Sequence, residues 1–146
     1  MTRVLVLYGP NLNLLGTREP EIYGHQTLAE LQSEIQHWAV ELGLEVVQFQ
    51  SNHEGALIDR LHERDFDASI VNAGGLTHTS VALRDALLGI SRPFVEVHLS
   101  DPSTREPFRH VNFLRDVALE SIVGRGPDGY REALAVLARH FGATAP

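Results

Sequence analysis

The sequence Val4-Leu5-Val6-Leu7 is apolar at every position and leads directly into Tyr8-Gly9-Pro10-Asn11. Successive side chains of a β-strand point to opposite faces, so an unbroken apolar run indicates a strand that is covered on both sides. Strands of this kind are typical of parallel sheets that lie between two layers of helices. The start of the chain therefore favours an α/β fold.

The rest of the chain alternates short apolar runs with segments of helical periodicity. The pattern predicts further strands at 44–49, 68–71, 94–99 and 121–123, and helices at 28–42, 55–63, 79–88 and 130–141. Thr27 and Glu30 have the spacing of a capping box at the start of the first helix. Five strands with short helical connections predict a flavodoxin-like, doubly wound parallel sheet with helices on both faces.

The length of 146 residues, 43% of them apolar, suits one domain with a buried core. We expect a single domain over residues 1–146 with a loose tail at 142–146. The long segment from Gly9 to Gly24 has no periodicity and is expected to be a lid loop, because Gly16 and Gly24 would permit a hinge. A mobile solvated loop is the alternative interpretation.

The chain contains neither cysteine nor lysine, so all 12 basic residues are arginines. Without cysteine it has no disulfide, no thiolate nucleophile and no cysteine-ligated metal. Without lysine it cannot form an imine on a side chain, and it cannot build a P-loop. Any catalysis must therefore use other chemistry.

The formal net charge of −7 argues against nucleic acid and anionic membranes as partners. No apolar run approaches the ~20 residues of a membrane-spanning helix. No signal peptide is evident at the start of the chain. We therefore expect a cytoplasmic protein with no nucleic-acid and no membrane partner.

Polar side chains gather where the predicted strands end. The first strand leads into Asn11, the second into 51–54 and the third into 72–75, and the fourth contains 96–100. Ligands of doubly wound sheets bind beyond the carboxyl ends of the strands. These segments are therefore predicted to form the site, although the asparagines alone are also consistent with ordinary turns.

Glu96 and His98 alternate along the fourth strand, so both project from one face of the sheet. A carboxylate beside an imidazole fixes the tautomer of the imidazole. Taken alone, the pair is consistent with a structural, a metal-binding or a catalytic role. A metal site would need a further ligand, for which His78 is the obvious candidate.

The lid loop holds Arg18 and Tyr23. A tyrosine acts as a base only when its pKa falls from about 10 toward neutrality, which requires permanent positive charge nearby. Arg18 is placed to supply that charge, and Arg109 is a second candidate. Arginine suits this role because it keeps its proton at any working pH.

Six ordered blocks of sequence are similar to those of the type II 3-dehydroquinate dehydratases. They are GPNLNLLG at 9–16, REP at 18–20 with YG at 23–24, QSNHEG at 50–55, THTSVALRDA at 77–86, EVHLS at 96–100 and REPFRH at 105–110. The resemblance covers nearly the whole chain. It implies elimination of water from 3-dehydroquinate through an enolate to give 3-dehydroshikimate, as in the shikimate pathway or in quinate catabolism. It also implies no metal or organic cofactor, and a homo-oligomer built as a dodecamer of four trimers.

The resemblance assigns catalytic roles position by position. Tyr23 matches the proton acceptor, and Arg18 matches the arginine that stabilises its phenolate. Asn11 matches the residue that holds a water molecule against the enolate oxygen. His98 matches the proton donor, and Glu96 matches its orienting partner.

Substrate-binding roles follow from the same match. The implied residues are Asn72, His78, Asp85, Leu99, Ser100 and Arg109. Leu99 and Ser100 correspond to backbone positions that hold the substrate carboxylate. Asp85 corresponds to a residue that reaches the site of a neighbouring subunit.

Several positions depart from the usual family pattern, among them Asp101-Pro102, Asn112 to Arg115 and Glu120-Ser121. Asp101 adds a carboxylate near the expected carboxylate site.

Two other classes of protein stay open. One is a flavin- or nucleotide-binding module, and the other is a homologue that is non-catalytic or that uses a metal held by Glu96, His98 and His78.

Overall fold

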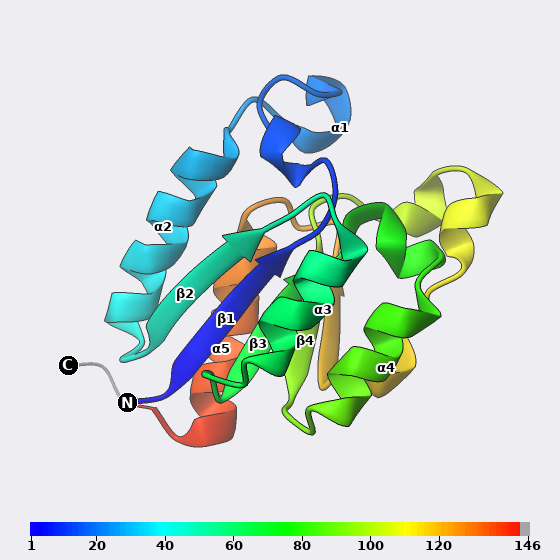
Figure 1. Ribbon diagram of the computed structural model, residues 1–146. Coiled ribbons are helices and arrows are strands. Elements are labelled where there is room, and N and C mark those ends of the chain that lie inside the picture. Colours follow the sequence, from blue (N-terminus) through cyan, green and yellow to red (C-terminus); the bar gives the residue numbers. More distant parts are fainter. Residues whose placement is uncertain (144–146) are drawn as a thin grey trace.

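In the computed structural model, which describes residues 1–143, the β-strands form one five-stranded parallel sheet in the order β2-β1-β3-β4-β5 (Figure 1). The strands are β1 (Arg3–Tyr8), β2 (Glu45–Gln50), β3 (Ala68–Asn72), β4 (Phe94–His98) and β5 (Glu120–Val123). The order reverses direction between β1 and β3, as expected of a doubly wound sheet. The predicted flavodoxin-like fold is confirmed.

Two pairs of helices cover the two faces of the sheet (Figure 1). They are α2 (Leu28–Glu41) with α5 (Asp128–Phe141) on one face, and α3 (Glu54–His62) with α4 (Val81–Gly89) on the other. None of the helices within residues 1–143 is long and apolar enough to cross a membrane. The predicted tail begins at Gly142, which ends α5 in the left-handed conformation, and residues 144–146 lie outside the described part of the chain.

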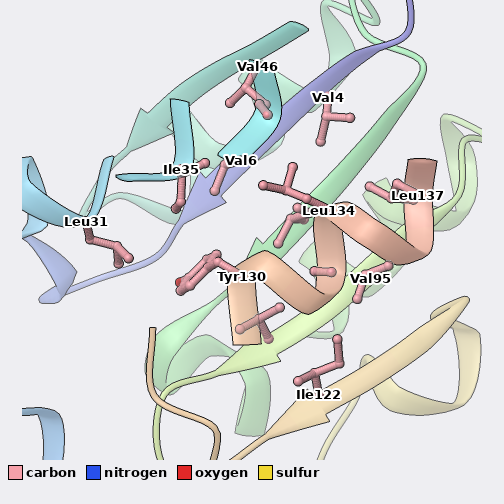
Figure 2. Packing of buried hydrophobic residues seen from close by; sticks show 14 of the residues in the cluster. Val4, Val6, Leu31, Ile35, Val46, Val95, Ile122, Tyr130, Leu134 and Leu137 are labelled. Carbon is pink, nitrogen blue, oxygen red and sulfur yellow. The ribbon is translucent and has the colours of Figure 1, made fainter. Parts of the chain in front are cut away.

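Strand β1 carries the centre of the hydrophobic core. Val4 and Val6 belong to one cluster with Ile35 of α2 and Leu134 of α5 (Figure 2), while Leu5 packs on the opposite side of the sheet. All five side chains are fully buried. The alternation explains why the strand is apolar at every position, because neither of its faces meets water.

Hydrogen bonds between side chains and backbone N–H groups set the residues at which α2 and α4 begin. At α2 the predicted capping box is present, with Thr27 Oγ1 accepting from the Glu30 N–H at 3.2 Å and Glu30 Oε1 accepting from the Thr27 N–H at 3.1 Å. The helix predicted from Thr79 begins two residues later, at Val81. The reason is that the Ser80 hydroxyl accepts the Leu83 N–H at 2.9 Å and caps the helix there.

The predicted lid loop at 9–24 contains more structure than its sequence indicates. It forms a 3₁₀ turn, η1 (Leu12–Leu14), and a four-residue helix, α1 (Pro20–Tyr23), so the expectation of a purely irregular loop was wrong. Pro20 favours the first turn of α1, and Gly24 ends that helix at φ 80°. A single turn is too short to produce a hydrophobic period. The segment lies over the carboxyl ends of the strands (Figure 1).

Gly9 holds the ends of β1 and β3 together. Its N–H donates to the Asn72 carbonyl at 2.7 Å, and a Cβ atom at Gly9 would lie 2.2 Å from the Ala73 carbonyl oxygen. Only glycine permits this approach of two backbones. The two segments that follow these strands are thereby brought to a common position at the edge of the sheet.

The central packing of α5 yields a stability prediction. We expect Leu134→Ala to lower the free energy of unfolding by about 2–5 kcal/mol, because it leaves a cavity against β1. Leu119→Ala, which removes the same atoms from a side chain that is 45% exposed, should cost far less. Urea denaturation followed by circular dichroism measures both, and equal losses would contradict the assigned core.

Candidate active site

A cavity of about 180 Å³ opens at the carboxyl ends of β1, β3 and β4, between the lid segment and the residues that follow β4. Nine of the predicted site residues line it, namely Asn11, Arg18, Tyr23, Asn72, His78, His98, Leu99, Ser100 and Arg109. The fold therefore brings together positions that are up to 98 residues apart, from 11 to 109.

Glu96 and His98 project from the same face of β4, as predicted. The imidazole Nε2 of His98 lies 2.8 Å from Glu96 Oε2. Because a carboxylate only accepts, Nε2 carries a hydrogen and donates it. The other ring nitrogen, Nδ1, is left free to act on a bound molecule, since His98 lines the cavity.

Two further donors hold the Glu96 carboxylate, which has no exposed surface. Asn112 Nδ2 donates to Oε2 at 2.7 Å, and Ser121 Oγ donates to Oε1 at 2.5 Å. Burial alone would raise the pKa of Glu96. The hydrogen bonds from His98, Ser121 and Asn112 outweigh it and keep the pKa below the usual value, so Glu96 is an anion at neutral pH.

His78 is held from outside the cavity. Its Nδ1 donates to the Val111 carbonyl at 2.6 Å, so its Nε2 is an acceptor. Burial lowers the pKa of His78 and outweighs the opposing effect of this hydrogen bond. A neutral imidazole at this position can accept a hydrogen bond from a hydroxyl group of a ligand.

Asn11 adopts the left-handed conformation, with φ 71°, directly after β1. Its backbone N–H donates to Asn52 Oδ1 at 2.9 Å, and Gln50 Nε2 donates to the same oxygen at 3.2 Å. The N–H of Gly9 is also engaged, by the Asn72 carbonyl. These bonds fix Asn11, and they remove the free N–H groups that a nucleotide phosphate would need after the first strand.

Asn72 ends β3 with a buried side chain. It donates from Nδ2 to the Tyr130 hydroxyl at 3.0 Å and accepts the Gly74 N–H at 3.2 Å. Tyr130 is fully buried in α5. The amide of Asn72 is thus oriented by α5 on one side of the sheet while it lines a cavity at the edge.

Two guanidinium groups flank Tyr23. Arg105 Nη1 donates to the Tyr23 hydroxyl at 2.7 Å, and the Arg18 guanidinium carbon lies 5.2 Å from the centre of the Tyr23 ring. Two permanent positive charges thus lie beside the Tyr23 side chain. Arg18 therefore lies where the sequence placed it. Arg109, the second candidate for this charge, donates to Glu106 at 2.8 Å, and the contact with the Tyr23 hydroxyl comes from Arg105.

Arg105 was missed although the sequence holds a signal for it. Arg105-Glu106-Pro107 repeats the tripeptide Arg18-Glu19-Pro20, and in both places the proline begins a short helical turn. The two copies also meet, with Arg105 Nη2 lying 3.6 Å from Glu19 Oε2. This ion pair joins the lid segment to the loop that follows β4.

Three of the carboxylates considered from the sequence lie outside the cavity lining, namely Glu96, which bonds to His98, and Asp85 and Asp101. Asp85 is an exposed residue of α4 and does not join the site within one chain. Asp101, expected to add charge near the site, instead caps a 3₁₀ turn, where its Oδ1 accepts from the Ser103 N–H at 2.9 Å and from the Ser103 hydroxyl at 2.7 Å. The neighbouring Pro102, rather than Asp101, faces the cavity.

The residues considered for a metal centre are all engaged in hydrogen bonds within the protein, and His78 bonds to the Val111 carbonyl. Both oxygens of Glu96 accept hydrogen bonds, and His98 Nε2 points at Glu96 rather than toward His78. Within residues 1–143, no group of three or more histidine, aspartate or glutamate side chains is placed to hold a metal ion.

The fold and the cavity define a doubly wound α/β protein that pairs an arginine-flanked tyrosine with a carboxylate-anchored histidine. Residues 2–138 match the family model described as dehydroquinase class II. The chain belongs to this family.

Individual relatives agree with that assignment. The chain is 54% identical over 140 residues to the 3-dehydroquinate dehydratase of Bordetella avium (strain 197N), covering 94% of this chain and 97% of the relative. It is 52% identical to catabolic 3-dehydroquinase 1 of Fusarium vanettenii, with the same two coverages. The crystal structure of type II dehydroquinase from Propionibacterium acnes superposes with a TM-score of 0.92 at 36% identity, covering 95% of this chain and 97% of that one.

The surroundings of His78 predict its protonation state. We expect its imidazole to titrate below the ordinary pKa of 6.5 and to be neutral at pH 7, because burial disfavours the charged form. A pH titration followed by NMR of the imidazole carbons measures this, with a His78→Gln variant to assign the signal. Titration above 6.5 would contradict the described environment.

Proposed function

We propose that this chain, acting as one domain over residues 1–146, is a type II 3-dehydroquinate dehydratase that eliminates water from 3-dehydroquinate to give 3-dehydroshikimate. One observation carries the proposal: Tyr23, with its hydroxyl 2.7 Å from Arg105 and Arg18 over its ring, lines the same cavity as His98. The site thus offers a base and an acid for one elimination.

The base step uses Tyr23. The hydrogen on C2 of the substrate is acidic because it lies next to the C3 ketone. The Tyr23 phenolate takes this proton, and the electron pair of the C–H bond moves onto the ketone oxygen to give an enolate. Arg18 and Arg105 make the phenolate available and remain charged throughout, since neither guanidinium loses its proton.

Asn11 stabilises the enolate. Its left-handed backbone is fixed by Asn52, so its side chain is held at the cavity. In that position it orients a water molecule that donates to the enolate oxygen. A donor that is already in place when the charge develops lowers the barrier without reorganisation.

The acid step uses His98. With Nε2–H directed to Glu96, the protonated ring presents Nδ1–H to the C1 hydroxyl of the substrate. The enolate collapses to the ketone, its electron pair forms the C1–C2 double bond as the C1–O bond breaks, and the departing hydroxyl takes the His98 proton and leaves as water. The buried Glu96 anion balances the charge of the imidazolium before that transfer.

The remaining cavity residues bind substrate in this scheme. Asn72, His78 and Arg109 offer polar groups to the ring hydroxyls, and the backbone at Leu99 and Ser100 holds the carboxylate. Asp85 acts in the site of a neighbouring subunit, which agrees with its exposure on α4. From the resemblance to the family, we further propose that the active form is a dodecamer of four trimers, and from the sequence that it is cytoplasmic.

The chain is 54% identical to the relative named 3-dehydroquinate dehydratase and 52% identical to the relative named catabolic 3-dehydroquinase 1. Similarity therefore does not favour one of the two pathways. The chemistry is the same in the shikimate pathway and in quinate breakdown. The shikimate pathway is therefore proposed with quinate catabolism as an equally supported alternative.

The test of the function is the growth of enone absorbance when the purified protein meets 3-dehydroquinate. We expect steady turnover that a chelator such as EDTA does not change. Absence of signal at high protein concentration would overturn the proposed activity. Loss of turnover on chelation would support the metal-dependent alternative.

The second arginine yields its own prediction. Arg105→Gln removes the charge that contacts the Tyr23 hydroxyl, and we expect kcat to fall about 100-fold. Arg125→Gln is the control, because Arg125 is 61% exposed and pairs with Glu132 away from the cavity. Steady-state kinetics compare the two variants, and similar kcat values for both would refute the role of Arg105.

A further inference from the structure

We propose that Ser121 is a positioning residue for the proton donor, and that it acts through Glu96. Its side chain does not line the cavity, so it cannot touch the substrate. The inference rests on the proposed function. It concerns how the Glu96 carboxylate is kept ionised and hydrogen-bonded to His98.

The sheet places Ser121 at this position by register. Ser121 of β5 pairs with Glu96 of β4, so both side chains project to the same side. The next residue, Ile122, packs into the core under α5. Its burial fixes which face of the sheet each β5 side chain points to. The alternation of β5 therefore directs the Ser121 hydroxyl at the carboxylate.

The three donors divide unequally between the two carboxylate oxygens. Oε2 accepts from both His98 and Asn112, whereas Ser121 is the one donor to Oε1 among the described residues. Glu96 is fully buried, so its carboxylate is not in contact with bulk solvent in the folded protein. A buried charged oxygen without a donor is costly, and protonation relieves that cost. The Ser121 hydroxyl thus favours the anion.

Loss of the anion would reach His98 directly. Protonated Glu96 holds a neutral hydrogen bond to Nε2 instead of a charge-assisted one, and such bonds are roughly half as strong. The ring of His98 would then be less firmly oriented, and the carboxyl group would no longer balance the imidazolium. We therefore expect the proton-donation step, and not substrate binding, to suffer.

The titratable and charged groups around Glu96 are few. His98 lies on its own strand, and His78 approaches from the η2 turn (Gly74–His78). Arg84 of α4 is directed elsewhere, to Asp116 and the Phe113 carbonyl. Among the described neighbours, the hydroxyl of Ser121 and the amide of Asn112 are the uncharged groups that bond to the carboxylate.

Ser121 gives a cleaner test than Asn112. The Asn112 Oδ1 also accepts the N–H groups of Leu114 and Arg115, so replacing Asn112 would disturb its loop. The one side-chain hydrogen bond that the structure gives Ser121 is the bond to Glu96. Ser69 offers a matched control on β3, since its buried hydroxyl has no partner among the described residues.

The experiment compares Ser121→Ala, Ser121→Thr and Ser69→Ala with the parent protein in kcat and KM across pH. For Ser121→Ala we expect kcat to fall about tenfold with KM changed less than about twofold, and the acid limb of the kcat/KM profile to move to higher pH. Ser121→Thr keeps the hydroxyl and should restore the parent profile. A Ser121→Ala profile that superposes on the parent, or an equal shift in Ser69→Ala, would overturn the proposal.

A second measurement does not depend on activity. Because the folded protein holds the pKa of Glu96 below its ordinary value, its contribution to stability is present at neutral pH and is lost as the pH falls. In Ser121→Ala that contribution is smaller, so the free energy of unfolding should decline less steeply below about pH 5. Identical slopes would contradict the coupling even if the parent protein showed no dehydratase turnover.

Discussion

Parallel pairing is the constraint on which the rest of the structure depends. It sends the carboxyl ends of all five strands to one edge of the sheet, where the chain changes from buried strand to polar turn. Gly9 tightens that edge by letting the ends of β1 and β3 meet. Residues from the first loop and from the loop after β4 then share one cavity, so the ligand site follows from the topology.

Charge in this site is arranged without lysine. Arginines supply permanent positive charge at Tyr23, the proposed base, and the Glu96 anion supplies the opposite charge at His98, the proposed acid. Within the described part of the chain, the groups that bond to the anion are two neutral donors and an imidazole, none of them a guanidinium. The base and the acid are thus surrounded by opposite charges within one small cavity, which suits an elimination that moves one proton off carbon and another onto oxygen.

The sequence predicted the parts of the molecule that periodicity encodes. The alternation of Glu96 and His98, the Thr27 capping box and the apolar β1 are all local patterns, and the structure confirms them. Helix α1 was missed because one turn has no period. The contacts of Arg105 with Tyr23, and of Ser121 with Glu96, span 82 and 25 residues, so no local pattern encodes the contacts themselves. The neighbouring-subunit role of Asp85 stays a prediction.

The central claim is that a tyrosinate removes the proton, and Tyr23→Phe tests it most directly. The variant keeps the ring between the two arginines and loses only the oxygen that accepts the proton. We predict a fall in kcat of at least about 100-fold, with an unchanged circular dichroism spectrum and oligomeric state. Turnover at the parent rate would contradict the account.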